Sequence, residues 1–179
     1  MIDDVLNFWF AEGMDKKWFF KDQAFDREVE QKLLPLYEKA ILGELKDWES
    51  SVEGCLALCI LLDQVPRNLF RNDPKTYATD LAALIIAKVV VEKAWDKSLT
   101  QRERVFIYLP FEHSEDLSVQ QESLNLYRTL DDNSDWYVYA EKHEVIVRRF
   151  GRFPHRNQVL GRESTAEEIE FLTQPGSSF

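Results

Sequence analysis

Apolar residues recur along most of the chain with the period of a helix. Between residues 22 and 42 they fall at positions 25, 29, 33, 36, 37, 40 and 41, close to one every 3.6 residues on one face. No segment alternates between apolar and polar residues for long enough to form a sheet. The pattern therefore predicts an all-α fold with about eight helices in antiparallel hairpins and no sheet.

Cap signals and prolines set the expected helix boundaries. Capping-box sequences mark three predicted helix starts, at Ser50-x-x-Glu53, Thr100-x-x-Glu103 and Ser164-x-x-Glu167. Prolines are expected to bend, interrupt or end helices at Pro35, Pro66 and Pro110. Asp73 followed by Pro74 is typical of a helix start, and this helix is expected to reach Trp95.

Two amphipathic helices are predicted in the last third of the chain, over residues 116–130 and 136–150. A polar turn at residues 131–135 separates them. The apolar face of the first helix is expected to consist of Leu117, Leu124, Tyr127 and Leu130.

Composition supports one globular domain over residues 1–179. The 179 residues include only 6 Gly and 6 Pro, and no linker is visible, so a single core is expected. The chain has 22 Lys plus Arg against 32 Asp plus Glu, a net charge of −10. This acidity argues against nucleic acid or an anionic membrane surface as a partner, because both attract basic faces.

Targeting signals and cysteines point to a reducing compartment. The chain has no apolar run of 18 residues, and its first residues lack the pattern of a signal peptide, so a cytoplasmic location is predicted. Cys55 and Cys59 stand four residues apart in an apolar run, and we expect them to be buried core residues. No third cysteine exists to complete a thiolate metal site.

Three segments interleave ionisable groups with aromatic residues or proline, at residues 62–71, 108–115 and 143–157. They contain all three histidines of the chain. The arginines in or beside these segments are Arg67, Arg71, Arg148, Arg149, Arg152, Arg156 and Arg162. Arginine is favoured where a planar, permanently charged fork binds carboxylates or phosphates, so a binding site is expected here.

The leading hypothesis is a pocket for a small anionic metabolite, a carboxylate or phosphate compound, where the three segments meet. If the protein is an enzyme, His113 and His155 are the expected proton-transfer groups. The other candidate ligand-binding residues are Asp63, Arg67, Asn68, Glu115, Arg152, Arg156 and Asn157. No cofactor is predicted.

The alternative is a non-enzymatic helical scaffold for a protein partner, in which these charges pair with one another. Asp63 would then pair with Arg67, and Glu112 or Glu115 with Arg152 or Arg156. Carboxylates and imidazoles, which can ligate metals, also occur together at Glu112, His113, Glu115, His143 and His155. Their spacing dictates no coordination geometry, so no metal is predicted.

The same segments resemble an uncharacterised bacterial family, domain of unknown function 924. The resemblance rests on residues 61–68 (LLDQVPRN), 109–116 (LPFEHSED) and 150–157 (FGRFPHRN), with 160–165 and the tail from 175 matching as well. It implies a helical fold similar to the tetratricopeptide-like superhelix, and it implies no activity. The chain departs from the family at Val65, where Phe is usual, and at Glu112, where Met is common, which argues against a catalytic Glu112.

Overall fold

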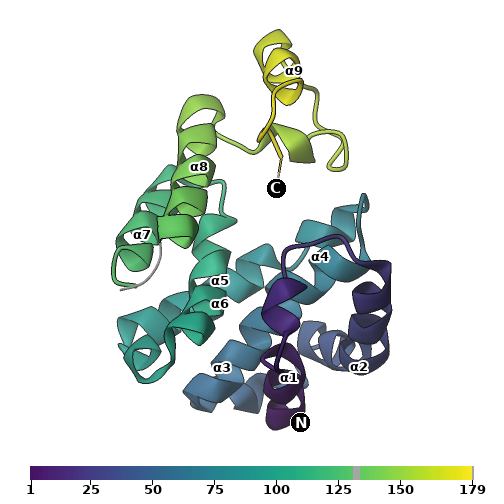
Figure 1. Cartoon of the computed structure of the whole chain (residues 1–179), viewed down its shortest axis with the longest axis vertical. Helices are drawn as coiled ribbons and strands as arrows, with labels where there is room; N and C mark the ends of the chain where they lie inside the picture. Colours follow the sequence, from purple (N-terminus) through teal and green to yellow (C-terminus); the bar gives the residue numbers. More distant parts are fainter. Residues whose placement is uncertain (131–133, 179) are drawn as a thin grey trace. The chain divides into compact units, whose positions relative to one another are not determined.

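The computed structural model describes residues 1–130 and 134–178, and the regular structure in these residues is entirely helical (Figure 1). The α-helices are α1 (Ile2–Trp9), α2 (Gln23–Ile41), α3 (Val52–Cys59), α4 (Val65–Leu69), α5 (Asp80–Glu92), α6 (Gln101–Glu112), α7 (Leu117–Tyr127), α8 (Ser134–Phe150) and α9 (Ala166–Leu172). Shorter helical segments are η1 (Met14–Lys16), η2 (Lys46–Ser50), η3 (Ile60–Gln64), η4 (Pro74–Tyr77), η5 (Trp95–Ser98) and η6 (Pro154–Arg156).

The all-α prediction is confirmed. Because α3, η3 and α4 follow one another without a break, the described residues contain eight separate α-helical stretches. Residues 131–133 of the predicted polar turn lie outside the described residues.

By its contacts the chain divides into two compact units. Unit 1 comprises residues 1–71 and 75–110, and unit 2 comprises residues 72–74 and 111–179. Each unit is described by itself below. The single domain over residues 1–179 and the tetratricopeptide-like superhelix stay predictions.

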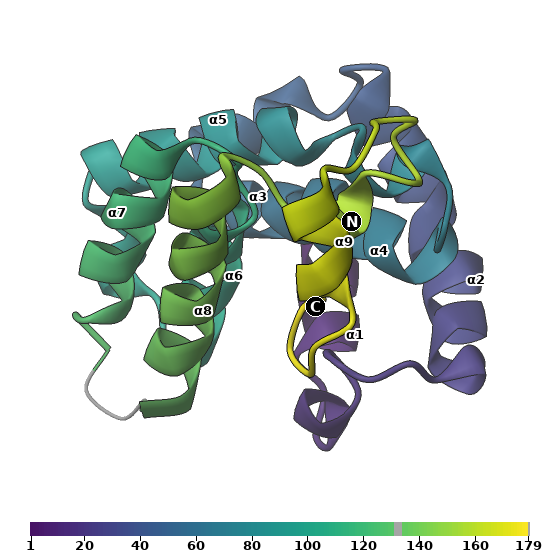
Figure 2. The ribbon, with the colours of Figure 1, turned by 90° about the horizontal axis from the view of Figure 1, so that it is seen from above.

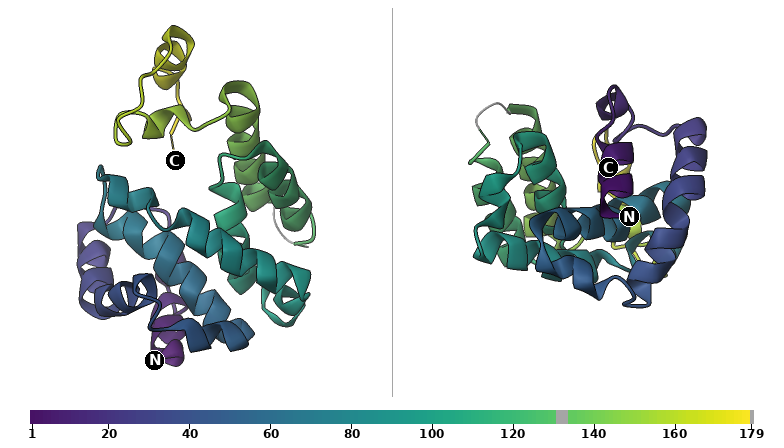
Figure 3. Two further views of the ribbon diagram at one scale, coloured as in Figure 1. Left: turned by 180° about the vertical axis from the view of Figure 1, so that it is seen from behind. Right: turned by 90° about the horizontal axis from the view of Figure 1, so that it is seen from below.

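In unit 1 the long helix α2 packs through the stripe that the sequence predicts. Its buried residues are Phe25, Val29, Leu33 and Tyr37, and Asp22 caps its N-terminus by accepting from two backbone N–H groups. α2 contacts α4 (Figure 3). The expected interruption at Pro35 is wrong: the helix continues to Ile41, with Pro35 on its exposed side.

Pro66 does not end the helix before it, because a wider turn admits the proline ring. η3 is a π-helical turn, in which the N–H of Val65 donates to the carbonyl of Ile60, five residues earlier. Pro66 cannot donate to the carbonyl of Leu62, and that carbonyl instead accepts a hydrogen bond from the Thr79 hydroxyl.

Two further prolines behave differently from the expectation. Pro110 lies inside α6, which ends two residues later, so the helix continues past a residue that has no N–H to donate to the carbonyl of Phe106. Pro74 starts the short 3₁₀ segment η4 rather than a helix to Trp95. The α-helix α5 begins at Asp80 and ends at Glu92.

The predicted caps are right at one position and one residue early at two. Thr100 and Glu103 form the expected reciprocal cap, with Glu103 accepting from the Thr100 N–H at 2.8 Å. Ser51, not Ser50, caps α3 through the N–H of Gly54 at 3.1 Å. In α9 the capping residue is Thr165 rather than Ser164. Thr165-x-x-Glu168 satisfies the capping-box pattern as well as Ser164-x-x-Glu167 does, whereas Ser51 is followed three residues later by Gly54 and caps its helix without the box.

Both cysteines are buried free thiols in the core of unit 1. Burial raises the pKa of Cys55 to about 11 and that of Cys59 well above its usual value. Protonated, enclosed thiols behave as small apolar side chains, as the sequence analysis expects.

In unit 2, α7 and α8 run antiparallel, side by side (Figure 2). α7 buries the predicted face in part: Tyr127 and Leu130 are buried and Leu124 is half-buried, but Leu117 is exposed. The polar residues Gln120 and Ser123 are fully buried on this helix as well. Gln120 donates to the carbonyls of the chain just before α7, at Glu112 and Ser114. Gln120 can therefore be buried on a helix face that otherwise carries apolar residues, because its amide pairs with the carbonyls of this turn.

None of the helices in residues 1–130 and 134–178 is long and apolar enough to cross a membrane.

The close contact between α3 and η2 yields a test by substitution. A Cβ at Gly54 would lie 2.0 Å from the carbonyl oxygen of Trp48, a backbone atom that cannot move aside. We therefore expect Gly54→Ala to lower the free energy of unfolding by about 1–3 kcal/mol in urea denaturation. Helix propensity alone predicts the opposite, a gain of up to about 1 kcal/mol, so a stabilised variant would contradict the packing described.

Candidate functional site

Hydrogen bonds and an ion pair in unit 2 join the end of α6 to the segment after α8. The carboxylate of Glu115 accepts from both terminal nitrogens of Arg162, at 2.7 and 2.9 Å, and from the backbone N–H of Phe153 at 2.8 Å. Arg156 donates to the carbonyl of His113 at 3.1 Å. Two of the three segments singled out in the sequence therefore meet within one unit.

All three histidines lie in this region: His143 and His155 contact the ring of Phe153, and His113 lies against His143. Ring centroids are 6.1 Å apart between His113 and His143, 5.5 Å between His143 and Phe153, and 5.7 Å between Phe153 and His155. The guanidinium of Arg156 lies 4.5 Å from the centre of the Phe153 ring. We call these five residues the histidine cluster. His143 and Arg156 are buried, whereas His113 and His155 are partly exposed.

His143 forms a buried pair with Glu112. Its Nδ1 lies 3.0 Å from the carboxylate of Glu112 and 2.8 Å from the carbonyl of Tyr139. Both neighbours are acceptors, so Nδ1 carries the proton and Nε2 carries the lone pair. Burial holds the pKa of His143 well below its usual value, and the nearby His113 and Arg156 lower it further. The buried imidazole is therefore neutral at neutral pH.

Two of the three arginines that the sequence offers as ligand-binding residues, Arg67 and Arg152, bind carboxylates of the chain. Arg152 donates to both oxygens of Glu168, at 2.7 and 2.8 Å, and to the carbonyl of Glu163. The expected pairing of Arg152 with Glu112 or Glu115 is wrong, because Arg162 occupies Glu115. Asn157 is buried and donates to Ser164 and Glu168, and it accepts from Arg162.

These contacts lower the pKa values of the Glu168 and Glu115 carboxylates. Hydrogen bonds from Arg152 and from the N–H of Thr165 lower the pKa of Glu168 to about 2, against the opposing effect of burial. Burial alone would raise the pKa of Glu115, but the hydrogen bonds from Arg162 and Phe153 bring it below its usual value. Both side chains are ionised at neutral pH and neutralise their arginines.

The first of the three segments lies in unit 1, and its charges pair there. Arg67 binds both oxygens of Asp80, at 2.8 and 2.9 Å, and donates to the carbonyl of Asp63 at 2.6 Å. The predicted pair with the Asp63 carboxylate is present at 3.4 Å. Burial would lower the pKa of Arg67, but the two aspartates raise it above its usual value. Asn68 donates to Asp26, which also pairs with Arg71.

Nine candidate residues thus separate into two sets. His113, His155 and Arg156 belong to the histidine cluster, and Glu115 and Asn157 lie beside it in unit 2. Arg152 lies in unit 2 as well, where it shares Glu168 with Asn157, whereas Asp63, Arg67 and Asn68 take part in polar networks of unit 1. That all nine line one pocket stays a prediction. Among the described residues, no group of three His, Cys, Asp or Glu side chains is placed to hold a metal ion.

Two residues of this region are absent from the predicted catalytic and ligand-binding set: His143, which the sequence suggests only as a possible metal ligand, and Glu168. His143 fits the helical stripe of α8 as an ordinary core residue, and its pairing with Glu112 joins positions 31 residues apart. Glu168 stands in the alternative capping box Thr165-x-x-Glu168, whose spacing was the one available signal.

Comparison with known proteins identifies the family. A model of a family described as "Bacterial protein of unknown function (DUF924)" matches residues 5–176. The chain belongs to this family. The protein of unknown function ATU0120 from Agrobacterium tumefaciens, whose structure is solved, is 42% identical to this chain. The alignment covers 96% of each chain with a TM-score of 0.90, and no curated protein matches.

The contacts of Glu168 predict how acid affects this DUF924 protein. Its pKa is lower in the folded state than in the unfolded chain, so its stabilisation is complete above about pH 4.5 and is lost as pH falls towards about 2. Glu168→Gln should be less stable at pH 7 and should lose less stability than the parent between pH 5 and 2. Circular dichroism during urea unfolding at each pH measures this.

Glu170→Gln, on an exposed position of the same helix, is the matched control and should follow the parent. A Glu168→Gln profile parallel to that of the parent over this pH range would contradict the assigned pairing.

Proposed function

We propose that unit 2 binds a small anionic metabolite, a carboxylate or phosphate compound, at the histidine cluster. One observation carries the proposal: two imidazoles, of His143 and His155, and the buried guanidinium of Arg156 surround the Phe153 ring, and His113 lies against His143. The Arg156 guanidinium in this cluster is a local positive charge in a chain of net charge −10, and such a charge attracts anions. Unusual titratable groups gathered in one place are more frequent at functional sites than elsewhere.

The partly exposed and the buried residues of the proposed site would have different roles. His113 and His155 are partly exposed and would contact the ligand, and Arg156 beneath them would supply a permanent positive charge. His143 would hold its neighbours in place through its pair with Glu112. If the site catalyses a reaction, His113 and His155 are the groups we propose for proton transfer, because free imidazole titrates near neutral pH.

A second candidate function is a non-enzymatic scaffold that binds a protein partner. The observation in its favour is that Arg67, Arg152 and Arg162 each bind both oxygens of one carboxylate. Under this alternative the polar networks fix the positions of helices, and no small ligand binds.

We further propose a cytoplasmic location, without nucleic acid or membrane as a partner. The support is the acidic composition, which disfavours polyanionic surfaces, and the two buried free thiols, which need no oxidising compartment.

Thermal unfolding with added anions separates the two candidates. Sodium phosphate or sodium citrate, at ionic strength held constant with sodium chloride, should raise the melting temperature of the parent. At about 100 times the dissociation constant, binding to the folded state contributes about 2.7 kcal/mol. For a chain of this size that corresponds to a rise of about 5–10 °C.

His113→Gln and His155→Gln should each reduce this rise, and Arg149→Gln should leave it unchanged, because Arg149 is exposed and pairs with Glu167. If neither anion stabilises the parent more than sodium chloride does, the site does not bind anions and the scaffold is favoured. An anion effect that persists in both histidine variants would place binding elsewhere.

A further inference from the structure

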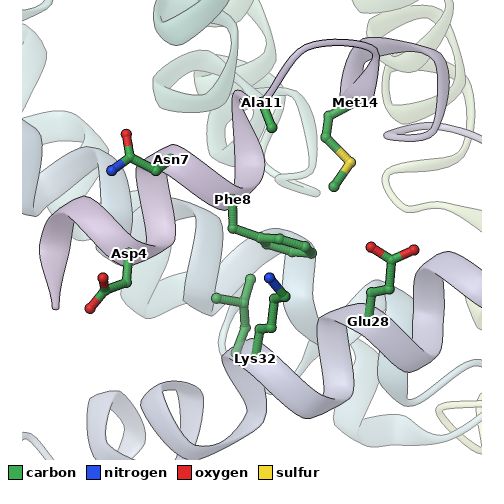
Figure 4. Close-up of a pocket in the computed structure, with 8 residues that line it drawn as sticks. Asp4, Asn7, Phe8, Ala11, Met14, Glu28 and Lys32 are labelled. Atoms are coloured by element: carbon green, nitrogen blue, oxygen red, sulfur yellow. The ribbon is translucent and has the colours of Figure 1, made fainter.

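A groove in unit 1 lies between α1, η1 and α2, and none of its lining residues belongs to the histidine cluster (Figure 4). Its volume is about 500 Å³, within the range of sites that hold small molecules. The lining residues are Asp4, Asn7, Phe8, Ala11, Met14, Glu28, Lys32 and Leu33.

The floor of the groove is apolar and firmly packed. Phe8, Met14 and Leu33 are 8%, 9% and 1% exposed, so they present a small apolar surface at the base rather than loose side chains. The Phe8 ring stacks on Phe25 with centroids 6.2 Å apart, which fixes its orientation. Met14 can adapt to ligands of different shape, because its side chain is unbranched and polarisable.

One positive charge in the groove has no carboxylate partner. The ammonium of Lys32 lies 5.0 Å from the centre of the Phe8 ring, and none of the described carboxylates lies within ion-pair distance of it. Glu28, one turn earlier on α2, pairs with Lys17 at 3.4 Å. The Lys32 ammonium, beside the apolar floor of the groove, is therefore available to pair with an anion.

We propose that this groove binds a monocarboxylate that carries an apolar chain or ring. The carboxylate would pair with Lys32, and the apolar part would lie along Phe8, Met14 and Leu33. Asp4 and Glu28 flank Lys32 on opposite sides of the groove (Figure 4), and these acidic groups disfavour ligands with a second negative charge. The site takes amphipathic single anions rather than the small polar anions proposed for unit 2.

Methionine methyl groups offer a direct readout, because the chain has only two, Met1 and Met14. With ¹³C-methyl methionine in the full chain, titration with sodium octanoate should shift the Met14 resonance saturably and leave Met1 unchanged. Octanol, which has the same chain and no charge, should bind several-fold more weakly. Absence of a Met14 shift at millimolar octanoate, or equal affinity for octanol, would overturn the proposal.

Two variants on α2 test the role of Lys32. Lys32→Gln keeps a polar side chain and removes the charge, and it should weaken octanoate binding about two- to fivefold, as expected for a partly exposed ion pair. Lys39→Gln removes another exposed lysine of the same helix and should bind octanoate like the parent. Both substitutions are at exposed positions, and circular dichroism verifies that they fold. Unchanged affinity in Lys32→Gln would contradict the assigned pairing.

Discussion

An arginine that binds a carboxylate and a backbone carbonyl together is the contact on which both units depend. Arg67 joins Asp80 to the carbonyl of Asp63, and Arg152 joins Glu168 to that of Glu163. Arg162 joins Glu115 to the carbonyl of Phe153 in the same way. A planar guanidinium has five donors in a fixed fork and can make both contacts, whereas a lysine ammonium is a point charge.

This use of arginine determines what the rest of the site can do. A guanidinium committed to a carboxylate is neutralised, and removing one partner of a buried pair such as Asp63–Arg67 costs about 3–5 kcal/mol. The arginines enriched in these segments therefore serve mainly to bind carboxylates and backbone carbonyls near helix ends. In unit 2 the Glu115–Arg162 pair joins the two segments that carry His113 and His155, so the structural contact positions the proposed ligand-binding residues.

Local signals in the sequence predict the fold well, and long-range pairing is beyond them. The stripe of α2 and the cap at Thr100 follow from spacing alone. The π turn before Pro66 does not, because Thr79, from another segment, replaces the hydrogen bond that the proline lacks. The partner of Arg162 is 47 residues away, at Glu115, and several carboxylates fit equally well in sequence. Composition indicates which residues form the polar networks, but the tertiary fold determines which carboxylate pairs with which arginine.

The contact between Glu115 and Arg162 is tested most directly by a double-mutant cycle. The free energy of unfolding is measured for the parent, Glu115→Gln, Arg162→Gln and the double variant. Our account predicts that the double variant loses less stability than the two single losses added together, with a coupling of about 0.5–3 kcal/mol. Strictly additive losses would show that the two side chains do not interact, and would contradict the claim that this pair holds the two segments together.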